Sequence, residues 1–222
     1  MSVNQYAVIF DFDGVMVDTE PIYWDAMNKM AKKRGKEVTL ELKRKVMGAG
    51  GLISMSIMKE SLGLSESSGE LLEERGKIYG KLLQESGAKP MSGLFNVIDV
   101  MNKLKFRKAI ASSSRLEWIL FALKELDLVD EFPIIAHSRE VEHGKPAPDI
   151  FILALKKLNL PSERCVVLED TVVGVESAKG AKIKCIAVPN QYNRDMDFSR
   201  ADIVLKSLEE INEEMIKELM VL

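Results

Sequence analysis

The chain has 222 residues, of which 46% are hydrophobic and 29% are charged, with a formal net charge of −3 at pH 7. This content suits one large domain, or a core with a smaller accessory domain. Because both charge signs are mixed along the chain and no basic patch dominates, a polyanion-binding protein is not indicated, and we expect no nucleic-acid partner.

The apolar segments and the cysteines indicate in which cellular compartment the protein is expected. No stretch of about 20 apolar residues occurs, so we expect no membrane-spanning segment. The first residues lead almost directly into a predicted strand, without the basic-then-apolar pattern of a signal peptide, and we expect a cytoplasmic protein. Cys165 and Cys185 are too few for a disulfide scaffold and lack zinc-ligand spacing. Both lie in apolar runs, which favours buried free thiols over the alternative of a disulfide.

The first predicted element is a buried strand at residues 6–10, which leads directly into Asp11-Phe12-Asp13-Gly14. Side chains two residues apart on an extended chain project to the same side, so Asp11 and Asp13 would hold two carboxylates together. Like charges this close need a cation or a proton to compensate them. Gly14 would let the chain turn away sharply. The alternative is that these aspartates only cap a turn or helix.

The stretch 17–88 shows helical patterns and no convincing strand. Its helices are predicted from Pro21 to Gly35, from near Thr39, over about 53–62, and as a fourth that ends at Gly87.

This all-helical stretch between the first and second strands indicates an inserted domain. We expect an α/β catalytic core at 1–16 and 89–222 and a helical cap at 17–88. The junctions near Met16 and Lys89-Pro90 would be hinges.

The rest of the chain alternates between apolar runs and helical repeats. Further strands are predicted at 108–111, 133–136, 165–168, 184–188 and, more weakly, 203–205. Helices are predicted over about 94–104, 119–126 and 151–158. This alternation predicts an α/β fold, a doubly wound, Rossmann-like parallel sheet with right-handed crossovers.

Polar residues follow several of these strands, at the edge where doubly wound sheets bind ligands. Glu169-Asp170 comes after the strand at 165–168, and three or four carboxylates would converge if that strand neighboured the first. Such oxygen ligands suit Mg²⁺. The alternative is that Asp170 or Thr171 caps the next helix.

Two further sequence motifs, each weaker evidence by itself, could bind a phosphate group. Ser112-Ser113-Ser114 after the strand at 108–111 could cradle phosphate, although serine is also a routine N-cap. Gly144 and two prolines would aim Lys145 at a phosphate and a nucleophilic carboxylate, although a loop lysine is normally solvated.

In this order the motifs resemble the haloacid dehalogenase (HAD) superfamily, in the branch of β-phosphoglucomutase, phosphoglycolate phosphatase and sugar-phosphate phosphatases. The matching segments are 11–20, 111–114, 144–149 and 168–174. The inserted helices resemble that superfamily's helical cap of the first class, and the likeness covers essentially the whole chain.

The resemblance implies a phosphatase that acts on a small phosphorylated metabolite, such as a sugar phosphate. Asp11 would be the nucleophile that forms an aspartyl-phosphate, and Asp13 would protonate the leaving oxygen and then activate water. Ser112, with Ser113, and Lys145 would hold phosphoryl oxygens.

The resemblance also implies Mg²⁺ as the cofactor. It would lie on Asp11, on the backbone carbonyl of Asp13 and on Asp170, with Glu169 as a ligand or as an outer partner. Because this acidic set is complete, the metal-free dehalogenation known in the superfamily is less favoured.

The cap departs from the mutase pattern. Mutase relatives carry a His in the first cap helix, where this sequence reads Glu20-Pro21-Ile22-Tyr23-Trp24, and the only histidines are His137 and His143. This favours a hydrolase over a phosphomutase, which is the enzymatic alternative.

The cap also lacks the loop arginine of many relatives. The matching loop at 47–52 is glycine-rich and predicts either a flexible gate or a plain helix connection. A substrate with a second anionic group is thus less favoured, unless Arg75, Lys77 or Lys81 reaches the cleft. Apolar stripes would pack the cap core, with one or two members lining the pocket: Tyr23, Trp24, Met27, Met30, Met55 and Met58.

Two alternatives come from another class, a receiver-like phosphoryl switch and a binding protein without catalysis. The Asp-x-Asp on the first strand and the helical insert argue against the switch, and the intact motif set argues against the binding protein. Because a capped active site needs no partner chain, we expect a monomer.

Overall fold

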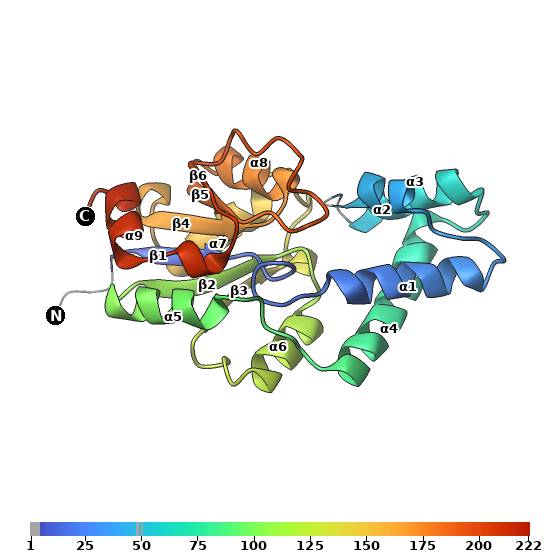
Figure 1. Cartoon of the computed structure of the whole chain (residues 1–222), viewed down its shortest axis with the longest axis horizontal. Coiled ribbons are helices and arrows are strands. Elements are labelled where there is room, and N and C mark those ends of the chain that lie inside the picture. The colour runs from blue at the N-terminus through green and yellow to red at the C-terminus, as the bar shows by residue number, and fades with distance from the viewer. Residues whose placement is uncertain (1–4, 48, 50) are drawn as a thin grey trace.

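The computed structural model describes residues 5–47, 49 and 51–222. These residues contain a six-stranded sheet in the order β3-β2-β1-β4-β5-β6, with all neighbouring strands parallel (Figure 1). Its strands are β1 (Ala7–Phe10), β2 (Arg107–Ser112), β3 (Ile134–His137), β4 (Cys165–Glu169), β5 (Lys184–Ala187) and β6 (Ile203–Val204). The predicted α/β fold is confirmed, and each predicted strand is present.

The central strand β1 lies between β2 and β4. Phe10 is level with Ile110 on one side and with Leu168 on the other. Because parallel strands end at the same edge of a sheet, the motifs that follow these three strands become neighbours.

Helices cover both faces of the sheet. Outside the insert, the described residues form α5 (Leu94–Lys103), α6 (Leu116–Glu125), α7 (Asp149–Leu158), α8 (Val172–Gly180) and α9 (Glu213–Met220). Successive β1 residues point to opposite faces, so Val8 and Phe10 join one apolar cluster while Ala7 and Ile9 join the other. Burial on both faces explains why the strands read as unbroken apolar runs.

The insert forms four consecutive helices in the described residues, grouped beyond one end of the sheet (Figure 1). They are α1 (Glu20–Lys32), α2 (Leu40–Val46), α3 (Gly51–Leu62) and α4 (Ser68–Ser86). Thr39 Oγ1 caps α2 by accepting from Leu42 N at 3.1 Å, and Ser67 and Glu70 form a capping box on α4.

The insert has an apolar cluster of its own, which includes the buried residues Met30, Met55, Met58 and Leu71. An inserted domain needs such a core of its own. The domain boundaries at residues 17 and 88 stay a prediction.

The two predicted junctions run side by side. Asp18 N donates to Lys89 O at 2.9 Å, and Met91 N donates to Met16 O at 3.0 Å. The chain therefore enters and leaves the insert through one paired segment.

Helix α4 approaches the core closely at α6. A Cβ on Gly80 would lie 2.9 Å from Trp118 Nε1, so only glycine permits this approach without a shift. The Trp118 ring lies 4.4 Å from the ring of Tyr79, which is fully buried. This packing holds Tyr79 against the sheet edge that carries the motifs.

Cys165 and Cys185 are buried and free, as expected. In the part of the chain that the structure describes, no helix has the length and apolar character to cross a membrane. Of the predicted loop at 47–52, Gly48 and Gly50 lie outside the described residues, and the segment from Gly51 onward belongs to α3 instead of a loop.

Candidate active site

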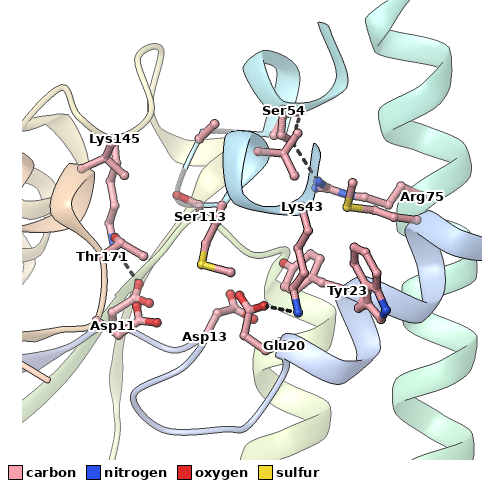
Figure 2. A pocket seen from close by; sticks show the side chains of 18 residues that line it. Asp11, Asp13, Glu20, Tyr23, Lys43, Ser54, Arg75, Ser113, Lys145 and Thr171 are labelled. Atoms are coloured by element: carbon pink, nitrogen blue, oxygen red, sulfur yellow. Dashed lines mark hydrogen bonds and ion pairs between the residues drawn. The ribbon is translucent and has the colours of Figure 1, made fainter. Parts of the chain in front are cut away.

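Asp11 lies at the carboxyl end of β1, where its backbone N–H donates to Leu168 O at 2.9 Å. The side chain is buried, and Oδ1 accepts a hydrogen bond from Lys145 Nζ at 2.6 Å (Figure 2). Burial raises the pKa of Asp11 to about 7, with Lys145 opposing the rise and Glu169 and Asp13 adding to it.

Lys145 bridges two carboxylates. Its Nζ lies 2.6 Å from Asp11 Oδ1 and 2.5 Å from Glu169 Oε1, and the side chain is buried. Burial alone would lower the pKa of Lys145, but the charges of Asp11 and Glu169 outweigh it and raise that pKa above its usual value. The loop lysine predicted from the sequence is therefore an internal cation.

Glu169 has a partner on each oxygen. Oε1 receives Lys145, while Oε2 accepts from Asp170 N at 2.9 Å and from Thr171 N and Oγ1, each at 3.0 Å. Thr171 Oγ1 in turn accepts from Gly174 N at 3.1 Å and caps α8. Thr171 therefore caps α8, which was the alternative interpretation of this motif. Glu169 and Asp170 nevertheless belong to the acidic cluster.

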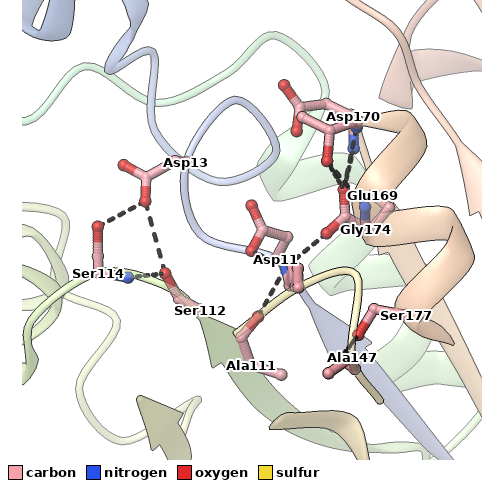
Figure 3. Close-up of polar contacts among 12 residues, drawn as sticks. Asp11, Asp13, Ala111, Ser112, Ser114, Ala147, Glu169, Asp170, Gly174 and Ser177 are labelled. Atoms are coloured by element: carbon pink, nitrogen blue, oxygen red, sulfur yellow. Dashed lines mark hydrogen bonds and ion pairs between the residues drawn. The ribbon is translucent and has the colours of Figure 1, made fainter. Parts of the chain in front are cut away.

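Asp170 differs from its neighbour because its Oδ1 is buried and has no hydrogen-bond partner within the described residues. Oxygens of Asp11, Glu169 and Asp170 all lie within 4.8 Å of one another (Figure 3). Burial, followed by the charges of Glu169 and Asp11, raises the pKa of Asp170 well above its usual value.

This cluster fits a divalent metal ion. Three buried carboxylates face the single positive charge of Lys145, and hard oxygen donors are what such ions prefer. Gly14 keeps the backbone close to the cluster, since a Cβ there would lie 2.2 Å from Asp170 Oδ2.

Asp13 points away from Asp11, toward the serine motif (Figure 3). Its Oδ2 accepts from Ser114 Oγ at 2.6 Å and from Ser112 Oγ at 3.5 Å, and its Oδ1 accepts from Tyr79 Oη at 3.4 Å. Burial raises the pKa of Asp13, although the hydrogen bond from Ser114 opposes this. Tyr79 of α4 therefore joins the insert to this carboxylate.

The three serines have separate places. Ser112 is fully buried, and its Oγ accepts from Ser114 N at 2.9 Å. Ser113 lines the cavity above Asp11, and Ser114 contacts Asp13. Sequence reasoning assigned the phosphate to Ser112 and Ser113 and missed the contact of Ser114.

A cavity of about 160 Å³ lies between the sheet edge and the insert (Figure 2). The sheet side contributes Asp11, Asp13, Ser113, Lys145, Asp170, Thr171 and Val173. The insert contributes Glu20, Tyr23, Trp24, Met27, Lys43, Val46, Met47, Ala49, Gly51, Ser54 and Arg75. Of the predicted apolar stripes, Tyr23, Trp24 and Met27 line the cavity, and the other methionines pack the cap core.

Two cations of the insert line this cavity, and one of them, Arg75, is among the three cap candidates named from the sequence. Arg75 of α4 donates to Ser54 Oγ at 3.1 Å and has no ion-pair partner among the described residues. Lys43 of α2 is buried, with its Nζ 3.5 Å from Glu20 Oε2. The sequence marked Arg75 as one candidate, whereas Lys43 was missed because α2 alone does not reveal which lysine faces inward.

Gly174 permits the contact between α8 and the acidic site. A Cβ on Gly174 would lie 1.9 Å from Glu169 Cδ, so we expect Gly174→Ala to displace Glu169 and destabilise the protein by about 1–3 kcal/mol. Urea unfolding would measure this. Gly144→Ala is the matched control, expected within about 0.5 kcal/mol, because no described atom beyond its own residue and its chain neighbours would lie within 4 Å of the added Cβ. Equal stability of both variants would contradict the steric argument.

Fold and site together define an α/β enzyme with paired carboxylates at the edge of a doubly wound sheet and a helical insert over them. Residues 8–188 match the family described as haloacid dehalogenase-like hydrolase. The chain is 35% identical over 184 residues to the phosphorylated carbohydrates phosphatase of Thermotoga maritima, covering 81% of this chain and 83% of that protein.

Solved structures of other proteins have the same fold. CbbY from Rhodobacter sphaeroides in complex with xylulose-(1,5)bisphosphate superposes with a TM-score of 0.81 at 26% identity, over 92% of this chain and 95% of that one. β-Phosphoglucomutase from Clostridium difficile shares the fold, with a TM-score of 0.84 at 24% identity over 97% of each chain. The chain belongs to the haloacid dehalogenase-like hydrolase family and is a phosphoric monoester hydrolase.

Proposed function

We propose that this enzyme hydrolyses a small phosphorylated carbohydrate, with Mg²⁺ as the cofactor and an aspartyl-phosphate on Asp11 as the intermediate. The observation that carries the proposal is the set of Asp11, Asp13, Lys145 and Asp170 that lines one cavity, with Asp11, Lys145 and Asp170 buried and Asp13 half-buried. The relative from Thermotoga maritima, named for phosphorylated carbohydrates, supports the substrate class.

In the proposed reaction, Asp11 attacks phosphorus through a carboxylate oxygen. The ester bond breaks, and Asp13 gives its proton to the departing alcohol oxygen. Asp13 then removes a proton from the water that attacks the aspartyl-phosphate, which releases phosphate and restores Asp11. Lys145, Ser112 and Ser113 neutralise and position the phosphoryl oxygens.

We propose that Asp11, Asp170 and the backbone carbonyl of Asp13 hold the cation. When bound, Mg²⁺ neutralises phosphoryl charge and orients the phosphate. Glu169 is an outer partner in this assignment, because its two oxygens already accept hydrogen bonds from Lys145, Asp170 and Thr171. Asp170 Oδ1, by contrast, is free to bind the ion.

We propose residues 17–88 as a cap that closes over the substrate and opens for release. The paired junction segments and the separate apolar cluster support this division. The segment Glu20–Trp24 stands in the sequence where mutase relatives carry a His, and the described residues that line the cavity include no His. Without a His to move the proton of a sugar hydroxyl, hydrolysis is favoured over a mutase reaction.

The test is phosphate release from a panel of phosphorylated metabolites that includes sugar mono- and bisphosphates and phosphate esters that are not carbohydrates, with Mg²⁺ and with EDTA. We expect metal-dependent release, fastest for phosphorylated carbohydrates. Faster conversion between sugar-phosphate isomers than phosphate release would establish a phosphomutase instead. Release that is equal in EDTA would contradict the role of the cation.

Arg75 is expected to bind the part of the substrate remote from the reacting phosphate. Its guanidinium faces the cavity without an acidic partner, so Arg75→Met should raise KM about 10-fold or more and change kcat less. Lys77→Met is the matched control, because Lys77 is exposed on the same helix and does not line the cavity. The same KM for both variants would exclude this role.

A further inference from the structure

The loop that follows β5, residues 189–195, folds back onto Asp170. Asn190 Nδ2 donates to Asp170 Oδ2 at 3.2 Å, and Asn193 Nδ2 donates to the backbone oxygen of Asp170 at 2.8 Å. Two amides from one loop therefore hold both the side chain and the main chain of this acidic residue. None of the sequence motifs included either asparagine.

The loop is built to keep these amides in place. Asn190 Oδ1 accepts from Tyr192 N at 2.9 Å, which forms a turn of the kind that asparagine favours. Asn190 N donates to Asn193 Oδ1 at 2.9 Å, and Asn193 is only 1% exposed. The Asn193 side chain thus holds the backbone of Asn190, and the Asn190 side chain holds the backbone of Tyr192, while both amides donate to Asp170.

The insert supports the same loop from the other side. Lys43 Nζ of α2 lies 3.6 Å from the ring centroid of Tyr192, which is a cation–π contact. Arg44 pairs with Asp195 at 3.6 Å, but both side chains are more than half exposed, so this ion pair contributes little. The loop is therefore held between the insert and Asp170.

The hydrogen bond to Oδ2 has a chemical consequence for Asp170. A neutral amide orients the carboxylate without removing its charge, whereas a lysine would compete with a cation. The other oxygen, Oδ1, is buried and has no partner in the described part of the chain. Asp170 is thus fixed with one oxygen occupied and the other presented to the acidic cluster.

We propose that Asn190 positions Asp170 for the divalent cation, with Asn193 fixing the backbone beneath it. This inference rests on the cation site of the proposed function. Hydrogen-bond partners that orient a metal ligand typically account for a 10- to 100-fold difference in metal affinity. Asn190 acts through Asp170 and is a positioning residue, not a ligand.

Isothermal titration calorimetry of the full-length protein with Mg²⁺ alone, without substrate, tests the proposal. Asn190→Ser keeps an oxygen that can support the turn but removes the amide donor. We expect Mg²⁺ to bind this variant about 10- to 100-fold more weakly than the native protein. Gln191→Ala, an exposed position in the same loop with no hydrogen bond in the described structure, should bind Mg²⁺ as the native protein does.

Melting of both variants without metal separates positioning from folding. An unchanged melting temperature with weakened Mg²⁺ binding supports the proposal, and Asn190→Thr replaces the serine variant if the latter does not fold. Native affinity in a folded Asn190 variant would overturn the inference and leave the proposed function intact. A native protein that binds no Mg²⁺ and releases phosphate equally in EDTA would overturn both.

Discussion

Asp11→Asn is expected to lower kcat by about 10⁴-fold or more while the fold remains intact. The amide cannot form the aspartyl-phosphate, and removal of a nucleophile abolishes the covalent route without removing substrate contacts. Phosphate release with Mg²⁺ measures the loss, and circular dichroism checks the fold. Asp99→Asn, an exposed change on α5, is the control and should retain native activity. Undiminished turnover of Asp11→Asn would end the proposed mechanism.

The same substitution should stabilise the metal-free protein at alkaline pH. The pKa of Asp11 is about 7 in the folded chain, above its ordinary value of 3.8, because burial disfavours the charged form. The folded state therefore holds a proton that the unfolded state has lost, and this stability is lost as pH rises from about 4 through 7. Burial raises the pKa of Asp170 and Asp13 as well, with the same sign.

Thermal melting in EDTA from pH 5 to pH 8 measures this effect. We expect the native melting temperature to fall over that range, and Asp11→Asn to fall less and to melt higher than native at pH 8. Saturating Mg²⁺ should restore much of the native stability at pH 8, because a bound cation stabilises the folded state. A native protein whose stability rises steadily over this range would contradict the assigned direction.

Lys145→Met is expected to destabilise the metal-free protein by about 3–5 kcal/mol at pH 8, the usual effect of removing one partner of a buried ion pair. Nζ lies 2.5–2.6 Å from two buried carboxylate oxygens, and their charges would lose their compensation. The loss of stability should be smaller at pH 5, where Asp11 becomes protonated. Turnover should fall about 10³-fold, because a cation aimed at the phosphoryl group is lost.

Lys157→Met provides the comparison. Lys157 pairs with Glu140 at 2.7 Å, but both side chains are about one-third exposed, so the change should be about 1 kcal/mol or less. Urea unfolding at pH 5 and pH 8 measures both variants. If Lys145→Met were as stable as Lys157→Met at pH 8, the buried lysine would not be what balances the acidic cluster.

The sequence by itself determined the strands and the order of the motifs. Buried parallel strands are short and apolar throughout, and a polar residue that directly follows such a strand must lie at one edge of the sheet. The positions of Asp11, Ser112 and Glu169 directly after apolar runs were therefore sufficient to predict that all three lie at that edge. The helices of the insert were equally readable, because Pro21, Thr39 and Gly87 mark their ends locally.

Only the tertiary structure decided which of these groups meet. The convergence of Asp170 on Asp11 depends on β4 lying beside β1, which is a long-range pairing. Ser114 reaches Asp13, and Tyr79 reaches it from the insert, although nothing near either residue in the sequence indicates this.

The tertiary structure also decided which side chains of each helix face the cavity. Lys43 and Arg75 line the cavity while other lysines of the same helices are exposed, because the packing of the helices fixes which side turns inward. Asn190 contacts Asp170 because a loop folds back across the sheet edge. Local preference specifies an element and its ends, but the direction of a polar side chain is set by the packing around it.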